Sequence, residues 1–378
     1  MRRAVGIVLA TVGVLFAAAP AGSATPAWSV SGPIAGAQYG RLAAVSCVSP
    51  ASCFAVGAAD TPTTETRLVA RWNGANWQAQ ANQNPPGASD SQFTSVHCRT
   101  STSCVAVGQY VTAGKTKTLV ERWNGAKWLI EASPNPPAIA VSGLSSVQCA
   151  SATFCVAVGS YFEDTSDSSA EKTLVEQWSG SSWAIVPSPN RVNAIDSGLT
   201  GVSCTSASNC FAVGHFDTNL VTRTLIEHWD GGNWLVVSSP NPANVAQSEL
   251  SGVACVNATR CLAVGSGRGT LVERWNGTSW LMMTSPNPLG ATGASLTGVS
   301  CPSPTRCYAV SDSFKGKAVQ RLVETWNGTG WGIVATPLPA GTIRSSLNGV
   351  SCATTASCFA VGEYRLGTSR RPLINRYS

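Results

Sequence analysis

A pair of cysteines separated by five residues recurs seven times along the chain and accounts for all 14 cysteines. The first cysteines of successive pairs lie 51, 51, 55, 51, 46 and 51 residues apart, so a unit of about 50 residues repeats throughout. A repeat of this length is typical of β-propellers, in which each unit forms one four-stranded blade. The pairs are Cys47 with Cys53, Cys98 with Cys104, Cys149 with Cys155, Cys204 with Cys210, Cys255 with Cys261, Cys301 with Cys307 and Cys352 with Cys358.

Two tryptophans five residues apart follow six of the seven cysteine pairs. They are Trp72 and Trp77, Trp123 and Trp128, Trp178 and Trp183, Trp229 and Trp234, Trp275 and Trp280, and Trp326 and Trp331. One unit, residues 296–337, contains four short segments rich in Val, Leu, Trp and Tyr, bounded by Gly, Pro and Asn. Such segments are typical of β-strands, and Asn327-Gly328 is a tight-turn signal because both residues tolerate positive φ. We therefore predict an all-β fold of four-stranded antiparallel blades, with strands A to D in chain order.

The two ends of the repeat predict how the ring closes. Tyr377 lies 19 residues after Cys358, which is the usual spacing of the first tryptophan, and no strand D follows it in the sequence. Trp28 lies 19 residues before Cys47, close to the 21 residues that separate a second tryptophan from the next cysteine elsewhere. We predict that an N-terminal strand around Trp28 completes the C-terminal blade. The result is a seven-bladed β-propeller without an open sheet edge.

Each cysteine pair spans the turn between strands A and B, so it can bridge one hairpin. Cross-strand neighbours approach closely enough for a disulfide after a small adjustment. A zinc site is the first alternative, but such sites favour closer cysteine pairs with histidine partners, and the chain has only His97, His215 and His228. Reactive thiols are the second, but an exported chain would not carry seven identical sets of them. We predict seven local disulfides.

Residues 1–24 have the three parts of a secretory signal peptide: Arg2 and Arg3, an apolar stretch over 4–19, and small residues at the end. The alternative is a membrane anchor, but the apolar stretch has 16 residues, whereas a membrane span needs about 20. We expect cleavage, and we expect residues 25–378 to form a single propeller domain outside the cell.

The charge of the chain argues against nucleic acid as a partner. Only 12% of the residues are charged and the net charge is +6, so no basic footprint is evident. We expect a monomer without a cofactor, whose partner is a glycan, a cell-wall component or an extracellular protein.

The end of strand B resembles that of the kelch and galactose-oxidase-like group of propellers. Kelch units end strand B with two glycines, and here the first is kept at Gly57, Gly108, Gly159, Gly214, Gly265 and Gly362, with Ser311 in the sixth unit. The second position holds Ala58, Gln109, Ser160, His215, Ser266 and Glu363 instead. There is also a partial likeness to the Asp-box of sialidase-type propellers, in which Gly277 to Trp280 matches but Trp275 replaces the aspartate. The resemblance implies the architecture and no particular activity.

The tryptophans and the acids of strand C recur in most units. Exposed tryptophans could stack on sugars, but their constant spacing favours packing between blades. The recurring acids lie beside residues such as Arg122 or Arg274, and we interpret them as blade-edge ion pairs rather than catalytic groups. They are Glu121, Glu176, Glu227, Glu273 and Glu324.

The loop between strands B and C is where the repeat varies. The interval from second cysteine to first tryptophan (or Tyr377) is 19 residues in five units, but 23 in the third and 14 in the fifth. In propellers this loop opens on the usual ligand face, so we predict ligand-binding residues there. The candidates are Tyr161, Glu163, Asp164, Asp167, His215 and Asp217. A calcium site and a solvated acidic loop are the alternatives; we predict no metal site, because the spacing matches no known calcium loop.

No catalytic constellation can be assigned from the sequence. Glycoside hydrolysis needs two placed carboxylates, and no such pair, nucleophile elbow or phosphate-binding loop is evident. We therefore expect a binding module and leave the enzyme question open. The alternative is a secreted hydrolase or lyase that uses the B–C face.

Overall fold

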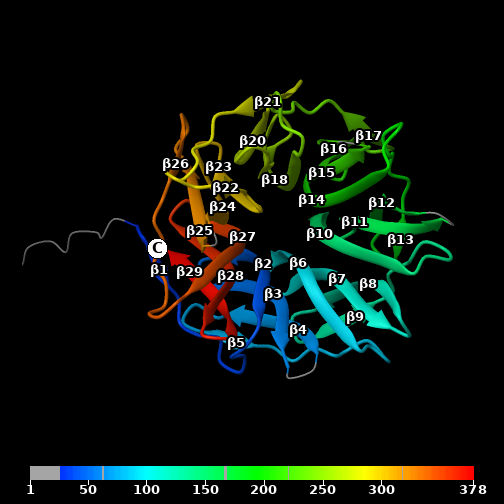
Figure 1. Cartoon of the computed structure of the whole chain (residues 1–378). Coiled ribbons are helices and arrows are strands. Elements are labelled where there is room, and N and C mark those ends of the chain that lie inside the picture. Colours follow the sequence, from blue (N-terminus) through cyan, green and yellow to red (C-terminus); the bar gives the residue numbers. More distant parts are fainter. Residues whose placement is uncertain (1–25, 62–63, 166–167, 220, 317) are drawn as a thin grey trace, which may run out of the picture.

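The computed structural model describes residues 26–61, 64–165, 168–219, 221–316 and 318–378; the predicted signal peptide lies outside this part. The strands form seven blades around a central axis, as Figure 1 shows. The predicted seven-bladed, all-β fold is confirmed. Blades 2 and 3 are additionally joined by one parallel bridge between Thr116 and Val141. Within the described ranges, no helix is long and apolar enough to cross a membrane.

The first four blades have regular strands A to D. Blade 1 comprises β2 (Arg41–Ser49), β3 (Ser52–Asp60), β4 (Glu65–Trp72) and β5 (Trp77–Ala79). Blade 2 comprises β6 (Asp90–Thr100), β7 (Ser103–Thr112), β8 (Lys115–Trp123) and β9 (Trp128–Glu131). Blade 3 comprises β10 (Val141–Ser151), β11 (Phe154–Thr165), β12 (Ser168–Trp178) and β13 (Trp183–Ile185). Blade 4 comprises β14 (Asp196–Ser206), β15 (Asn209–Thr218), β16 (Val221–Trp229) and β17 (Trp234–Val237).

The last three blades follow the same order with two local changes. Blade 5 comprises β18 (Glu249–Asn257), β19 (Arg260–Ser266), β20 (Thr270–Trp275) and β21 (Trp280–Met283). In blade 6, strand A is split into β22 (Gly293–Ala294) and β23 (Gly298–Ser303), followed by β24 (Arg306–Lys315), β25 (Ala318–Trp326) and β26 (Trp331–Ile333). Blade 7 comprises β27 (Arg344–Thr354), β28 (Ser357–Leu366), β29 (Ser369–Tyr377) and the N-terminal β1 (Trp28–Val30).

The ring is closed by β1, as predicted. This strand pairs antiparallel with β29, and Trp28 lies opposite Tyr377. The buried indole of Trp28 also meets the ring of Tyr308 in blade 6, with 5.8 Å between the ring centroids. Strand D of the last blade therefore comes from the other end of the chain and leaves β29 with a partner on both sides.

All seven predicted disulfides are present, and the described residues include no free cysteine. Each bridge joins strands A and B of one blade, with Cα atoms 3.9–4.1 Å apart. The bridges are Cys47 to Cys53, Cys98 to Cys104, Cys149 to Cys155, Cys204 to Cys210, Cys255 to Cys261, Cys301 to Cys307 and Cys352 to Cys358. These covalent links fix the register of each hairpin at the turn between the two strands.

The second cysteine of every pair is buried in the core of the ring. Each of these cysteines is at most 1% exposed; they are Cys53, Cys104, Cys155, Cys210, Cys261, Cys307 and Cys358. They begin strand B at the end of the blade opposite the B–C loops. Their role is therefore structural, and they are not part of a site on the B–C face.

The glycine that ends strand B is required by a close approach of strand A. A Cβ at Gly57 would clash with the carbonyl oxygen of Arg41, where β2 shifts register. Blade 6 has Ser311 at this position, and there strand A is broken between β22 and β23. The Ser311 hydroxyl instead lies 3.1 Å from that of Ser295 in the break. The one blade that lacks this glycine is thus also the one blade whose strand A is interrupted.

The tryptophans pack between the blades, as predicted. Most are buried, and the two rings of each pair lie 5.7–5.9 Å apart. They fill the wedge-shaped space between neighbouring sheets rather than standing on the surface as platforms.

The interpretation of the strand C acids as ion pairs with neighbouring arginines is wrong for four of the five. The glutamates are fully buried, and these four accept a hydrogen bond from a serine hydroxyl that follows strand D of the preceding blade. The pairs are Ser133–Glu176, Ser188–Glu227, Ser239–Glu273 and Ser285–Glu324. Only Glu121 faces an arginine, Arg67 of blade 1, at 3.3 Å. Burial, which the repeat pattern alone did not reveal, excludes an edge position.

Candidate functional site

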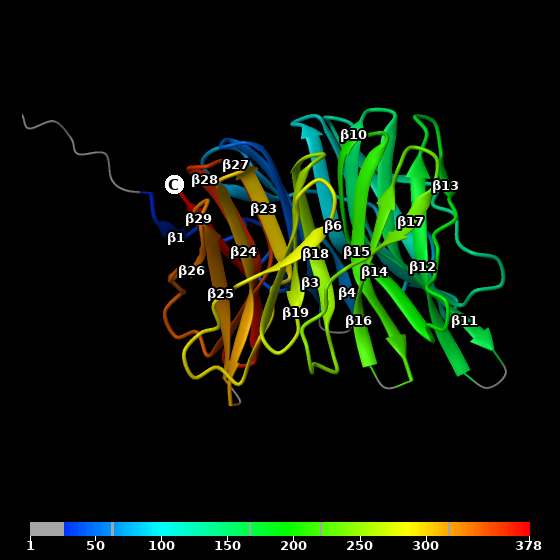
Figure 2. The ribbon, with the colours of Figure 1, turned by 90° about the horizontal axis from the view of Figure 1, so that it is seen from above.

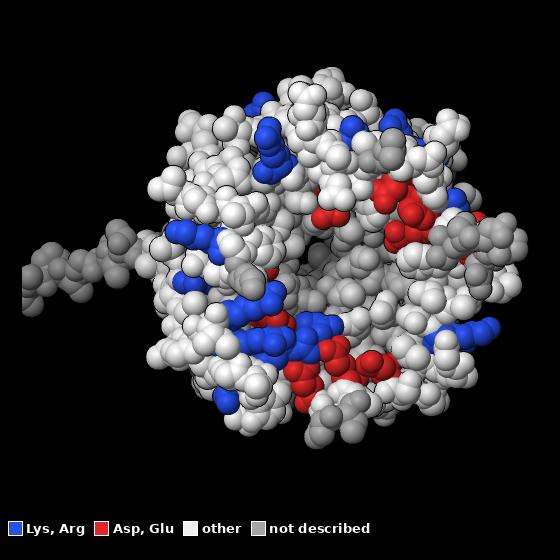
Figure 3. All heavy atoms as spheres, viewed as in Figure 1, with Lys and Arg blue, Asp and Glu red and all other residues white. Residues whose placement is uncertain are grey.

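The loops between strands B and C all open on one face, which lies at the lower edge of Figure 2 and faces the viewer in Figure 3. Acidic and basic side chains gather there around the opening of the central channel (Figure 3). The channel itself has a volume of about 200 Å³ and is lined by small residues of the seven inner strands, such as Ser95, Ser146 and Gly252. The charged B–C face, rather than the channel wall, therefore carries the chemically distinctive groups.

The predicted residues of blade 3 are only partly described. Tyr161 and Glu163 lie on β11, where the Tyr161 hydroxyl donates a hydrogen bond of 3.4 Å to the Glu163 carboxylate. Burial raises the pKa of Tyr161, and the neighbouring charge of Glu163 raises it further. The backbone of Asp164 belongs to β11, whereas Asp167 lies outside the described residues.

His215 and Asp217 lie on β15 of blade 4 and meet a residue of blade 3. The Nε2 atom of His215 is 3.5 Å from a carboxylate oxygen of Glu171. The backbone N–H of Glu171 in turn donates a hydrogen bond of 2.8 Å to Asp196, which lies opposite Asp217 in the sheet. We call Glu171, Asp196, His215 and Asp217 the blade 3–4 cluster.

Sequence reasoning proposed His215 and Asp217 as binding residues on this face, counted Glu171 only among the acids of the long blade 3 loop, and did not identify Asp196. Glu171 was visible as part of the long acidic loop, but its contact with His215 depends on the packing of two blades. Asp196 is the first residue of strand A in blade 4, in a part of the repeat where no interval varies, so the repeat pattern contained no signal for it. Among the described contacts, none joins Tyr161 or Glu163 directly to His215.

The electrostatics of the cluster favour a charged histidine. A hydrogen bond with Glu171 raises the pKa of His215, although burial opposes the shift. The same hydrogen bond lowers the pKa of Glu171. Asp217 and Glu249 also raise the pKa of His215 through their charges. With its imidazole protonated, His215 forms an ion pair with Glu171 within an acidic surrounding.

Two buried atoms of the cluster have no hydrogen-bond partner within the described part of the chain. They are Nδ1 of His215 and Oδ1 of Asp217. Buried polar atoms are satisfied in most proteins, so an unpaired donor and acceptor side by side indicate a place where a bound molecule or water completes the bonding. A side chain at Gly198 would crowd this place, because its Cβ would lie 2.9 Å from Glu171 and 3.1 Å from His215.

Among the described residues, the cluster shows no serine or cysteine nucleophile paired with His215. No hydroxyl donates to His215 in the described part of the chain, and every cysteine is held in a disulfide. The described residues also contain no group of three or more His, Cys, Asp or Glu side chains that could hold a metal ion. The arrangement can accept hydrogen bonds from a ligand and donate hydrogen bonds to it.

Comparisons with known proteins give the fold and no family. No family model and no curated protein matches the chain. Among solved structures, YCF48 bound to a D1 peptide matches with a TM-score of 0.54 and 12% identity, covering 93% of this chain and 94% of that one. YCF48 from Cyanidioschyzon merolae gives a TM-score of 0.53 at 12% identity, covering 93% and 98%. A protein of unknown function from Dyadobacter fermentans gives 0.51 at 8% identity, covering 93% and 97%. At these identities the likeness supports the propeller fold alone, and the kelch-like relationship stays a prediction.

Proposed function

We propose that residues 25–378 form one exported domain that binds a glycan, a cell-wall component or an extracellular protein on its B–C face. The observation that carries the proposal is the unpaired Nδ1 of His215 beside the unpaired Oδ1 of Asp217 in the blade 3–4 cluster. A ligand that accepts a hydrogen bond from the protonated histidine and donates one to the aspartate would satisfy both atoms. Sugar hydroxyl groups, which both donate and accept, have this property, as do the amides of a peptide.

The disulfides support the exported location. Seven bridges in one chain persist in an oxidising compartment and are rare in the cytosol. The predicted leader over residues 1–24 is consistent with such a route. Outside the cell, the charged B–C face of the ring (Figure 3) would be exposed to polysaccharides and proteins.

The proposal is tested by binding and turnover on the same protein. The mature domain is applied to a glycan array, to purified cell-wall polysaccharides and to a set of extracellular proteins, and chromogenic glycosides are incubated with it in parallel. We expect binding without turnover, and we expect His215→Ala and Asp217→Ala to abolish it. Turnover of any substrate would instead favour the alternative of a hydrolase or lyase.

Ser266→Ala provides the matched control. Ser266 occupies in blade 5 the position that His215 occupies in blade 4, and its hydroxyl is exposed and bonded to Glu249. This variant should keep full binding. Equal loss in Ser266→Ala and His215→Ala would contradict a site at the blade 3–4 cluster.

A further inference from the structure

The space between neighbouring blades is filled at most interfaces by an aromatic or guanidinium group. The residue after each second cysteine points toward the first tryptophan of the next blade, or toward Tyr377 in blade 7. Aromatic rings fill four of the interfaces with centroid distances of 5.1–5.3 Å; the pairs are Phe54–Trp123, Phe211–Trp275, Tyr308–Tyr377 and Phe359–Trp72. At the blade 2–3 interface, where the residue is the smaller Val105, the guanidinium of Arg122 lies 4.4 Å from the ring centroid of Trp178.

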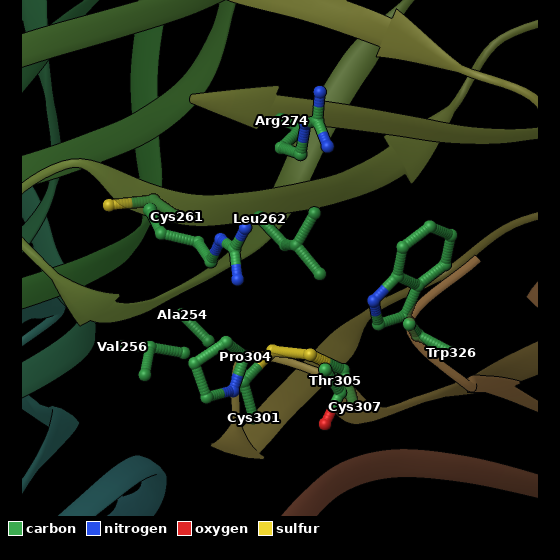
Figure 4. A pocket seen from close by; sticks show the side chains of 12 residues that line it. Ala254, Val256, Cys261, Leu262, Arg274, Cys301, Pro304, Thr305, Cys307 and Trp326 are labelled. Carbon is green, nitrogen blue, oxygen red and sulfur yellow. A yellow bond between two sulfur atoms is a disulfide. The ribbon is translucent and has the colours of Figure 1, made fainter. Parts of the chain in front are cut away.

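The blade 5–6 interface is open instead. The residue after the second cysteine is Leu262, and a pocket of about 110 Å³ lies between it and Trp326. Figure 4 shows Leu262 and Trp326 on either side of this space, with the Cys301–Cys307 disulfide along one wall. The pocket adjoins the turn that holds Pro304 and Thr305, so it lies at the end of the blades opposite the B–C loops.

Trp326 contributes a free donor to this pocket. In five other blades the indole N–H of the first tryptophan donates to the carbonyl oxygen three residues after the first cysteine, as from Trp275 to Ala258 at 3.2 Å. Trp326 makes no such bond within the described chain, although Pro304 stands at the corresponding position. Its nitrogen-bearing edge is turned toward the pocket in Figure 4.

Two arginines add positive charge to the pocket, and the described contacts give neither of them a protein counter-ion. Arg274 and Arg260 line the pocket, and the Nε atom of Arg274 is buried without a hydrogen-bond partner among the described residues. Blade 2 shows what is missing: Arg122, the counterpart of Arg274, donates to Glu131 at 2.5 and 3.0 Å. In blade 5, Met283 occupies the position of Glu131, because both face a strand C valine in the same register.

The geometry points to a binding site for a carboxylate attached to a compact apolar body. The charged donors of Arg260 and Arg274 and the N–H of Trp326 match the two oxygens of a carboxylate. Apart from Thr305, the remaining wall is mostly apolar, formed by residues such as Val256 and Leu262, and would leave most hydroxyl groups of a sugar without partners. The pocket is somewhat smaller than the cavity of about 150 Å³ that accepts benzene in another protein, which favours a body of about four or five carbons.

Isovalerate is the first probe, because it combines a carboxylate with a branched body of this size. Titration calorimetry with the mature protein should show binding, and isovaleramide, which has the same shape without the charge, should bind roughly tenfold or more weakly, since a hydrogen bond to a charged group contributes about 1.5–3 kcal/mol. Glucuronate places the carboxylate on a hydroxylated ring and should also bind more weakly. Equal binding of the amide, or tighter binding of glucuronate, would overturn the assignment.

Variants distinguish loss of the pocket's own contacts from a general effect of added charge on binding. Met283→Glu supplies Arg274 with the acid found in blade 2 and should weaken isovalerate binding by about tenfold or more. The control is Met282→Glu, which adds the same charge at an exposed neighbouring position. It should leave the affinity for isovalerate within about twofold, because a surface charge is screened. Arg260→Ala tests whether the second guanidinium contributes to binding. Because Arg260 is exposed, this variant should not destabilise the fold. Unchanged binding in both Met283→Glu and Arg260→Ala would contradict the proposal.

A second binding experiment, with peptides, distinguishes a small carboxylic acid from the C-terminus of a protein as the source of the carboxylate. A short peptide that ends in valine is compared with its C-terminal amide. Binding of the free-acid peptide identifies the chain end of a protein as a source, whereas binding of isovalerate alone identifies a small acid. Absence of binding by isovalerate and by the peptide would overturn the site, and because His215→Ala leaves this pocket untouched, that failure is independent of the B–C face.

Discussion

The blade 2–3 and blade 5–6 interfaces begin from nearly the same residues and end with opposite outcomes. Both place an aliphatic side chain after the second cysteine, an arginine on strand C and a tryptophan on the next blade. In the first, Glu131 holds Arg122 and also accepts a hydrogen bond of 2.8 Å from Trp183, so the guanidinium lies over Trp178. In the second, Met283 offers no charge and the space stays open.

This difference teaches how a repeat acquires a site without changing its fold. The main-chain register is identical in the two blades, and the disulfides are in the same place. A single acidic side chain decides whether the arginine is neutralised within the protein or faces a pocket. Function in such a chain can arise where an internal contact of one blade is missing from another, as well as where a loop grows longer.

The largest effect is expected at a filled interface, where packing rather than charge is removed. Trp28→Ala takes away the ring that fills the space beside Tyr308 and Tyr377. Large-to-small changes of a buried tryptophan cost about 3–5 kcal/mol, and here β1 would also lose its anchor on β29. Chemical denaturation of the variant beside the parent measures the loss. An unchanged midpoint would mean that strand closure does not stabilise the ring.

A pH dependence is the next largest effect and compares the buried acids of the two interfaces. Burial raises the pKa of Glu176, between blades 2 and 3, to about 8, and that of Glu324, between blades 5 and 6, to about 7. Above about pH 5 the unfolded chain has released these protons, whereas the folded protein keeps them up to about pH 8 on Glu176 and about pH 7 on Glu324. Stability is fully present below the ordinary pKa of 4.5 and is lost as the pH rises through the folded value.

The measurement is a series of thermal melts from about pH 5 to about pH 8, the window in which the folded protein gives up protons that the unfolded chain has already released. We expect the melting temperature to fall by several degrees across this range. Glu176→Gln should remove a larger part of the slope than Glu324→Gln, since its pKa is raised further. A melting temperature that rises with pH would contradict the neutral, buried state of these carboxyl groups.

Most of the fold could be predicted from the sequence, because the residues that determine the hairpins and the ring closure recur at constant spacing in the repeat. The spacing of the cysteines set the hairpins, and the offsets of Trp28 and Tyr377 predicted the closing strand. The glycine of strand B was recognised only as a likeness to kelch units; the structure adds that it permits a close approach of strand A and that Ser311 replaces it in the blade whose inner strand is broken. Each is a local requirement that the same residue must satisfy in every unit.

The sites were less accessible to sequence reasoning, because they depend on contacts between units. Glu171 reaches His215 across a blade boundary, and the unpaired Arg274 is recognised only by comparison with the ion pair of Arg122. The residue that leaves Arg274 without an acid, Met283, resembles ordinary variation at a strand end, because this position also holds Gln80 in blade 1 and Val237 in blade 4. Loop length pointed to blade 3 and could not point to the turn side of blades 5 and 6.

A moderate effect is expected when the internal acid of blade 2 is removed. Glu131→Ala leaves Arg122 without its counter-ion and Trp183 without its acceptor, and hydrogen bonds to charged groups contribute about 1.5–3 kcal/mol. Both side chains of the ion pair are about one-fifth exposed, so water recovers part of the loss and we expect about 1–2 kcal/mol. Denaturant unfolding measures it. A neutral result would mean that stacking on Trp178 alone positions the arginine.

The smallest effect is expected from filling the open interface, and it tests the comparison most directly. Leu262→Phe introduces the ring that Phe54, Phe211 and Phe359 supply at three other interfaces. Because the ring enters existing space, we expect stability to change by less than about 1 kcal/mol, whereas Val105→Phe, where Arg122 already occupies the wedge, should cost about 1–3 kcal/mol through overpacking. Unfolding curves of the two variants, measured side by side, give the difference. Equal destabilisation would show that the blade 5–6 space cannot admit a ring, and would remove the basis for a pocket there.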